Sequence, residues 1–273
     1  MTMDAAAIRR RLAYGLCLLV YLYLVSPVIV VAAASFDTTS IYAANFPPKT
    51  LGLRWYFEIP QKYLHALAIS AAAASIASVV SGILGTLAAL AIVRGKLPGT
   101  EFLKAFFRAP LQIPFVVTGV VFLQFYYGYQ ALTGLQLAAT LPGLILAYVF
   151  VGTPYTVNTV GAVLDRLSPR LDEAAAILGA NRWTTFWCVT FPLIRPGLMA
   201  GTLYAFVVAF GDVPLSIFLS SSEYSTLPVE IFQTLQFDFR PTVLSISTII
   251  ALMSVVSLWL IQRLVGLDLV VKR

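Results

Sequence analysis

Residues capable of catalysis are few in this sequence and lie far apart. The only histidine, His65, adjoins a long apolar run, and the two cysteines, Cys17 and Cys188, are separated by most of the chain. A lone histidine is more often a packed or interfacial residue than a metal ligand or general base, and two distant cysteines match no metal-binding pattern. We therefore expect no catalytic site, no metal site and no cofactor bound by this chain.

Nucleotide binding also lacks its usual sequence signature. The chain has no Gly-x-x-x-x-Gly-Lys-Ser/Thr loop, the motif whose backbone amides hold nucleotide phosphates. Any ATP hydrolysis on which this protein depends must then take place on another polypeptide.

One acidic residue, Asp212, lies inside an apolar run, between Gly211 and Pro214. A carboxylate in a membrane is costly unless it faces the interior of a helix bundle or a water-filled path, and the flanking Gly and Pro could loosen the helix there. Asp212 is therefore our first candidate for lining a solute pathway. The alternative is a structural carboxylate that bonds to a neighbouring helix or lies near the outer interface. Weaker pathway candidates are Gln112, Gln124, Tyr126 and Tyr127.

Long apolar runs account for most of the sequence. Hydrophobic residues make up 59% of the 273 residues and charged residues 11%, whereas a soluble domain carries roughly a quarter charged residues. Runs long enough to cross about 30 Å of hydrocarbon occupy residues 12–34, 64–93, 110–127, 135–155, 197–219 and 241–261. No polar linker or charge block divides the chain. We predict an all-α integral membrane protein with six transmembrane helices, forming a single transmembrane domain over residues 1–273.

Three details refine this prediction. The first run is too long for a secretory signal, whose apolar part has about 7 to 15 residues, so we interpret it as a span and not as a cleaved leader. The second run is crowded with small residues, which let helices approach closely in lipid. We therefore expect this run to lie at the centre of the helix packing. The alternative is an Ala-rich span that mostly touches lipid.

The turn between the third and fourth runs is predicted at Gly128, Thr133 and Gly134.

The distribution of basic residues predicts the orientation in the membrane. Loops on the cytoplasmic side carry an excess of Lys and Arg, and placing both termini on that side assigns 14 of the 18 basic residues to it. These are Arg9, Arg10, Arg11, Arg94, Lys96, Lys104, Arg108, Arg166, Arg170, Arg182, Arg195, Arg263, Lys272 and Arg273. The basic residues left outside are Lys49, Arg54, Lys62 and Arg240, near acidic residues that include Asp238. We predict cytoplasmic N- and C-termini.

Residues 165–197, between the fourth and fifth runs, are too polar to span a membrane and read as two short helices. Ser168 can cap the first helix with Pro169 at its first position, and acidic residues follow in the first turn. Gly179 can end that helix in a left-handed conformation. Asn181 can cap the second helix, which Pro192 and Pro196 would end before the fifth run. We predict a helix-turn-helix elbow on the cytoplasmic surface.

The spacing within this elbow resembles that of the permease subunits of type I ATP-binding-cassette importers. The family signature is Glu-Ala-Ala, three residues, Gly, and then a spaced Pro before a membrane helix. This sequence has, in the same order and spacing, Glu173-Ala174-Ala175, Gly179-Ala180, Phe191-Pro192-Leu193 and Pro196-Gly197. An interfacial elbow with a purely structural role is the alternative, but amphipathicity alone would not demand this spacing.

The resemblance implies a role for the elbow and a set of partners. In that family the segment is a coupling helix, located between transmembrane helices 4 and 5, which sits in a groove of the ATPase subunit. The ATPase-coupling residues would be Glu173, Ala174, Ala175, Gly179, Ala180 and Pro192. The implied partners are an ATPase dimer that uses ATP and Mg, a second permease subunit that is a different chain, and an external or periplasmic solute-binding protein, all at a bacterial inner membrane.

Two further stretches resemble the spermidine/putrescine type of permease in particular. They are the first external loop, with Ala34-Ser35-Phe36-Asp37, Phe46-Pro47-Pro48-Lys49 and Leu51-Gly52-Leu53-Arg54-Trp55-Tyr56, and the later stretch Ser225-Thr226-Leu227-Pro228-Val229-Glu230. They point to a polyamine as the solute, while similar permeases serve phosphonates, ferric iron or other small solutes.

Two other classes of protein compete with this reading. A self-contained secondary transporter or channel could use the six spans and Asp212, but it should show inverted repeats, which the sequence does not display. A membrane enzyme would need clustered acids, bases or nucleophiles near one membrane face. The coupling motif weighs against both classes.

Overall fold

The computed structural model describes the backbone of residues 5–39, 45–95, 97–237 and 239–265, and within these ranges the side chains of residues 10–255. Lys96, Lys272, Arg273 and Asp238, which entered the topology prediction, lie outside the described residues, as do the side chains of Arg9 and Arg263. The described chain is almost entirely helical, with one isolated bridge between Asp37 and Leu51.

The helices follow one another without a sheet in the described part of the chain. In order they are α1 (Ala5–Ala34), α2 (Arg54–Phe57), α3 (Gln61–Arg94), α4 (Thr100–Arg108), a 3-10 turn η1 (Ala109–Gln112), α5 (Phe115–Thr133), α6 (Leu141–Arg166), α7 (Arg170–Ile177), α8 (Arg182–Thr185), a π-helical turn η2 (Phe186–Thr190), α9 (Phe191–Phe210), α10 (Ser216–Leu219), α11 (Leu227–Phe237) and α12 (Thr242–Val265).

Five of these segments are long and apolar enough to cross a membrane within the described residues: Arg10–Ala34, α3, α5, α6 and the continuous helical run Arg182–Phe210. The sixth predicted span corresponds to α12, whose described side chains form a shorter apolar stretch, Thr242–Val255. The predicted all-α membrane fold is confirmed. The predicted orientation of the termini stays a prediction.

Some predicted boundaries were wrong for local reasons. Of the residues predicted to form the turn after the third span, Gly128 lies inside α5, whereas Thr133 ends α5 and Gly134 follows in the left-handed conformation, φ +76°. The fifth predicted span does not continue to residue 219, because its helix ends at Phe210 and the chain turns before α10. The Gly and Pro that flank Asp212 thus break the helix outright.

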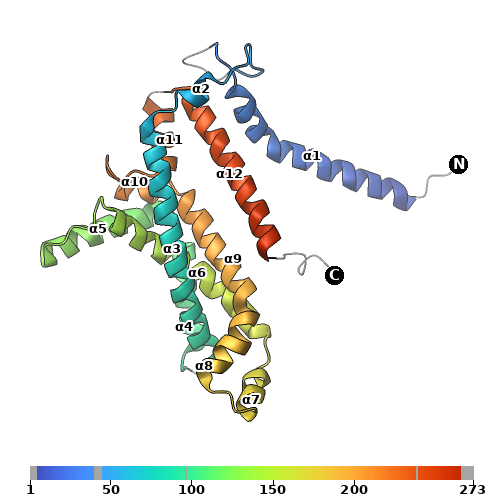
Figure 1. Ribbon diagram of the computed structural model, residues 1–273, viewed down its shortest axis with the longest axis vertical. Coiled ribbons are helices and arrows are strands. Elements are labelled where there is room, and N and C mark those ends of the chain that lie inside the picture. Colours follow the sequence, from blue (N-terminus) through green and yellow to red (C-terminus); the bar gives the residue numbers. More distant parts are fainter. Residues whose placement is uncertain (1–4, 40–44, 96, 238, 266–273) are drawn as a thin grey trace. The chain divides into compact units, whose positions relative to one another are not determined.

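The chain divides into two compact units, of which the first comprises residues up to Tyr63 together with those from Gln233 onward. In this unit α1 meets α12 near the end of α1 (Figure 1), and most α1 side chains from Arg10 to Val30 are exposed. The loop after α1 is ordered by buried Asp37, whose carboxylate accepts hydrogen bonds from the Thr39 hydroxyl at 2.6 Å and amide at 3.1 Å. The Thr39 hydroxyl, ahead of its amide, holds the pKa of the Asp37 carboxyl well below its usual range.

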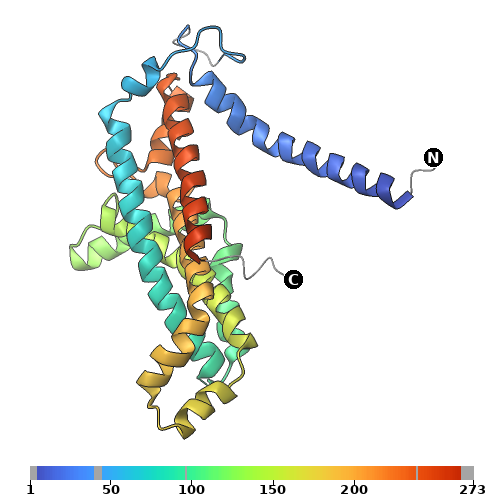
Figure 2. The ribbon, with the colours of Figure 1, turned by 45° about the vertical axis from the view of Figure 1, so that its right-hand side comes forward.

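The second unit, Leu64–Phe232, has α3, α6 and α9 side by side as its centre (Figures 1 and 2). Small residues allow this approach: a Cβ at Gly85 would lie 2.6 Å from the Thr156 side chain, and one at Gly152 would lie 2.7 Å from Ser81 Oγ. Ala73, Ala74 and Ala77 are fully covered or nearly so. The small-residue run of the second predicted span therefore packs against helices, as its composition indicates.

Candidate functional site

The first helix of the predicted elbow is α7, and its beginning follows helix-capping rules closely. Its N-cap is Pro169, one residue after the predicted cap, and Ser168 Oγ accepts a hydrogen bond from the Arg170 amide at 3.3 Å. Asp172 and Glu173 lie in the first turn, where the helix dipole favours negative charge. The local sequence therefore favours the start of a helix here.

The end of α7 depends on Gly179. Its φ of +83° is in the left-handed region, which glycine reaches without a steric penalty. Its amide donates to the Ala176 carbonyl and the Ala180 amide donates to the Ala175 carbonyl, both at 3.0 Å. These bonds satisfy carbonyls that the end of a helix leaves open, so Gly179 sets the direction in which the chain leaves α7.

The second helix of the elbow begins as predicted but does not end where predicted. Asn181 caps α8, its side chain accepting from the Thr184 amide at 2.8 Å. Pro192 and Pro196 were predicted to end this helix. Instead α8 continues through the π-helical turn η2 into α9, and both prolines lie in α9, Pro192 directly after the π-helical turn. Because the helix is continuous here, Pro192 removes one backbone donor next to that turn.

An exposed apolar surface runs over the elbow. Ile177 and Leu178 are 86% and 88% exposed, and Trp183 is 71% exposed. Trp183 and Trp187 pack edge to face with ring centroids 5.7 Å apart. Of the predicted coupling residues, Glu173, Ala174, Gly179 and Pro192 are exposed, Ala180 is partly exposed and Ala175 is buried. Exposed apolar surface of this extent on a polar segment is typical of a site that another protein covers.

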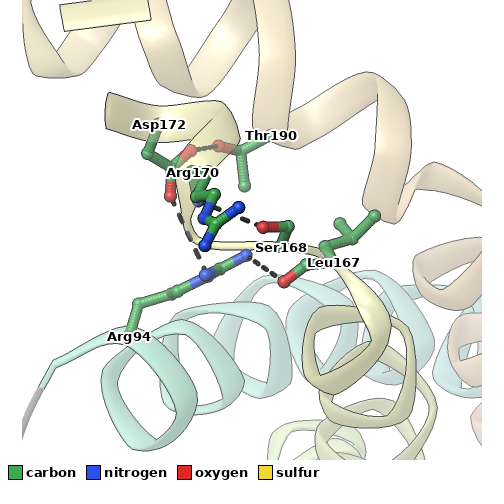
Figure 3. Close-up of polar contacts among 6 residues, drawn as sticks. All are labelled: Arg94, Leu167, Ser168, Arg170, Asp172 and Thr190. Carbon is green, nitrogen blue, oxygen red and sulfur yellow. Dashed lines mark hydrogen bonds and ion pairs between the residues drawn. The ribbon is translucent and has the colours of Figure 1, made fainter. Parts of the chain in front are cut away.

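One arginine that sequence reasoning did not single out lies beside the start of α7 (Figure 3). Arg94, the last residue of α3, donates from Nη2 to the Leu167 carbonyl at 3.1 Å, and its Nε lies 3.9 Å from Asp172 Oδ2. The other Asp172 oxygen accepts from the Thr190 hydroxyl at 3.3 Å. A basic residue at the end of a helix is a usual feature, so the sequence carried no signal that this one reaches the elbow.

Asp212 lies in the second unit as a buried helix cap. It is 6% exposed, and its Oδ2 accepts from the Ser216 amide at 2.8 Å and the Ser216 hydroxyl at 2.6 Å, while Oδ1 accepts from the Leu215 amide at 3.4 Å. The Ser216 hydroxyl also meets the hydroxyl of Tyr148 on α6. Asp212 thus joins the start of α10 to a neighbouring helix. Whether it also lines a solute path stays a prediction.

The weaker pathway candidates do not gather around Asp212. Tyr126 is buried and its hydroxyl donates to the Gly143 carbonyl at 2.6 Å, joining α5 to α6. Gln112, Gln124 and Tyr127 are exposed. His65 contacts the Glu223 carbonyl at 3.1 Å, which agrees with its interpretation as a structural or interfacial residue.

The fold and this site define a polytopic membrane protein with a short helix and exposed apolar side chains in the segment between α6 and α9. The chain belongs to the family described as "Binding-protein-dependent transport system inner membrane component", which residues 81–266 match. Family membership thus places the chain among the inner-membrane components of binding-protein-dependent transport systems.

Curated relatives include permeases for chemically different solutes. A probable sulfate transport system permease protein of Chlorokybus atmophyticus is 33% identical over 54% of this chain and 55% of its own length. Across three such sulfate relatives, this chain spans 55% to 63% of their length. The putrescine transport system permease protein PotI of Escherichia coli K12 is 28% identical over 85% of this chain and 83% of its own length.

Among solved structures, a chain of a bacterial ABC transporter for import of the acidic polysaccharide alginate matches over 97% of this chain and 98% of its own length, with a TM-score of 0.75 and 16% identity. A chain of the MetNI methionine ABC transporter matches over 79% and 98%, with a TM-score of 0.58 and 18% identity. At these identities the likeness concerns the fold.

Proposed function

We propose that this chain forms the translocation pathway of an ATP-driven importer for a small solute, and that α7 is the element through which a separate ATPase acts on it. The capped, exposed α7 with the apolar residues that follow it carries this proposal. The partners would be an ATPase dimer that binds ATP and Mg, a second permease chain and an external solute-binding protein, at a bacterial inner membrane.

The mechanism would use α7 as a mechanical contact. ATP-driven closure of the ATPase dimer would displace α7 and, through the continuous helix from Arg182 to Phe210, the membrane-spanning part of α9. Such rigid-body movements convert one packed arrangement into another, which would switch the pathway from outward to inward facing. All chemistry would remain in the ATPase.

For the solute we propose a polyamine. The alignment with the putrescine permease extends over 85% of this chain, and the predicted external matches at residues 34–56 and 225–230 belong to the same type. Sulfate is the second candidate, because the sulfate relative is more identical at 33%, although over 54% of this chain. Asp212 adds little support for a polyamine, because both oxygens of the Asp212 carboxylate already accept hydrogen bonds within this chain.

The proposed function is tested by isolating the tagged chain from its native membranes and identifying the proteins that remain bound. We expect an ATPase and a second permease to co-purify and the assembly to hydrolyse ATP. Cells lacking this chain should lose uptake of labelled putrescine and retain uptake of labelled sulfate. Loss of sulfate uptake alone would reverse the choice of solute, and an assembly without an ATPase would contradict the proposed class of importer.

A further inference from the structure

The proposed function requires that movement of α7 reach the membrane-spanning helices, and α9 is only one of them. We infer that Arg94 is a second connection, a positioning residue that links the coupling helix to the ends of α3 and α6. This inference rests on the proposed function but concerns a contact that the coupling motif does not contain.

The first part of the argument is where the guanidinium group lies. Arg94 ends α3, Leu167 follows the last residue of α6, and Asp172 lies in the first turn of α7. Arg94 Nη2 binds the Leu167 carbonyl at 3.1 Å, and the Arg94 side chain is 20% exposed. One side chain at the end of α3 therefore reaches the residue that follows α6 and the first turn of α7 (Figure 3).

The second part is the state of the contact with Asp172. Arg94 Nε is shielded from solvent and donates no hydrogen bond within the described residues, and its distance of 3.9 Å to Asp172 Oδ2 is that of an open ion pair. A charge-assisted N–H···O bond has a length of about 2.7–2.9 Å. A shift of α7 toward α3 by about 1 Å would close the pair and satisfy Nε.

The third part is what fixes the carboxylate. Asp172 Oδ1 accepts from the hydroxyl of Thr190, in the turn that leads into α9. Because the carboxylate is tied to that turn and the guanidinium to the end of α6, closing the pair moves two groups of helices relative to each other. The planar fork of arginine holds its donors in fixed directions toward the carbonyl and the carboxylate, whereas the ammonium of lysine is a point charge on a flexible stem.

The test is a double-mutant cycle in the assembled, tagged complex with Arg94→Gln, Asp172→Asn and both together. Arg166→Gln, an exposed arginine one residue from Leu167, is the matched control, and Arg94→Lys is the conservative variant. The measurements are the amount of co-purified ATPase, the rate of ATP hydrolysis, and uptake of whichever of labelled putrescine or sulfate the unaltered complex transports.

We expect Arg94→Gln to lower the uptake per ATP hydrolysed by about tenfold, the factor expected for loss of a charge-assisted hydrogen bond, with unchanged co-purification of the ATPase. The double variant should be no worse than Arg94→Gln alone, since the two residues act as a pair. Arg94→Lys should be intermediate and Arg166→Gln should match the unaltered complex.

Several results would overturn the inference while leaving the importer function intact. One is an unchanged uptake per ATP hydrolysed in Arg94→Gln. Another is a double variant whose loss of uptake equals the sum of the two single losses. The third is a loss of uptake that follows the yield of assembled complex in both Arg94→Gln and Arg94→Lys. An unaltered chain that recruits no ATPase would instead contradict the proposed function itself.

Discussion

At the scale of single residues, Asp212 shows how a carboxylate can be accommodated among apolar helices. Its two oxygens receive hydrogen bonds from the first residues of α10, and the Ser216 hydroxyl extends the chain of contacts to Tyr148. These donors offset part of the cost of burying the carboxylate. The geometry matches the structural alternative considered for this residue, and it is compatible with a second role in transport.

A comparison of two substitutions separates these roles. Asp212→Asn replaces one acceptor oxygen by a donor that must face the Leu215 or the Ser216 amide, so it should destabilise the protein by about 1–3 kcal/mol. Ser216→Ala keeps the charge but loses the hydroxyl contacts with Asp212 and Tyr148, so it should also lower the thermal unfolding midpoint.

Uptake per assembled complex then tests whether Asp212 lines the path. If Asp212 lines the path of a polyamine, uptake per assembled complex should be lower in Asp212→Asn than in Ser216→Ala. Equal uptake in the two variants would remove Asp212 from the pathway and leave it with its structural role alone.

At the scale of elements, the elbow shows which boundaries a sequence determines. The starts of α7 and α8 and the turn at Gly179 depend on caps, acidic first turns and a left-handed residue, all of which are local, and they were predicted to within a residue or two. The π-helical turn η2 was not predicted, because proline in a first turn and proline after a helix end look alike in sequence.

The elbow also carries a prediction about Gly179. Replacing it with Leu should abolish uptake and stimulated ATP hydrolysis while leaving membrane insertion intact, because a branched side chain at φ +83° costs about 1–2 kcal/mol and redirects the chain. Glu173→Lys should have the same effect by reversing the charge of an exposed position on α7.

The control for this prediction is Gly179→Asn, since asparagine tolerates the left-handed conformation. Insertion is checked by the amount of protein in the membrane fraction, and coupling by ATP hydrolysis of the purified complex. Normal transport by both Gly179→Leu and Glu173→Lys would contradict the coupling role of α7.

At the scale of the whole molecule, hydropathy located the five spans found in the described residues and placed the sixth predicted span at α12, because length and apolarity suffice to cross a bilayer. Hydropathy did not predict which distant segments are in contact. Arg94 lies 73 positions before Leu167, to which it donates a hydrogen bond, and 78 positions before Asp172, with which it forms an open ion pair. Nothing in the sequence around these residues indicates that they meet. The same is true of Tyr148 and Ser216, whose meeting depends on the packing of α6 beside α10.

The orientation in the membrane follows from charge and can be tested at two exposed serines, Ser168 and Ser222. Between them lies one crossing, the helical run Arg182–Phe210 of 29 residues, which at 1.5 Å per residue is about 43 Å long and exceeds the hydrocarbon thickness of about 30 Å. The two positions should therefore lie on opposite sides. The excess of basic residues places Ser168 inside.

Single cysteines at these positions test this in intact cells, after Cys17 and Cys188, both exposed, are replaced by Ser. We expect Ser222→Cys to react with a membrane-impermeant maleimide and Ser168→Cys to react only after the cells are permeabilised. Labelling of both from outside would contradict the crossing between them, because one helix of this length cannot return to the side on which it began. Reversed labelling would leave the crossing intact and overturn the cytoplasmic placement of α7, and with it any contact between α7 and an ATPase inside the cell.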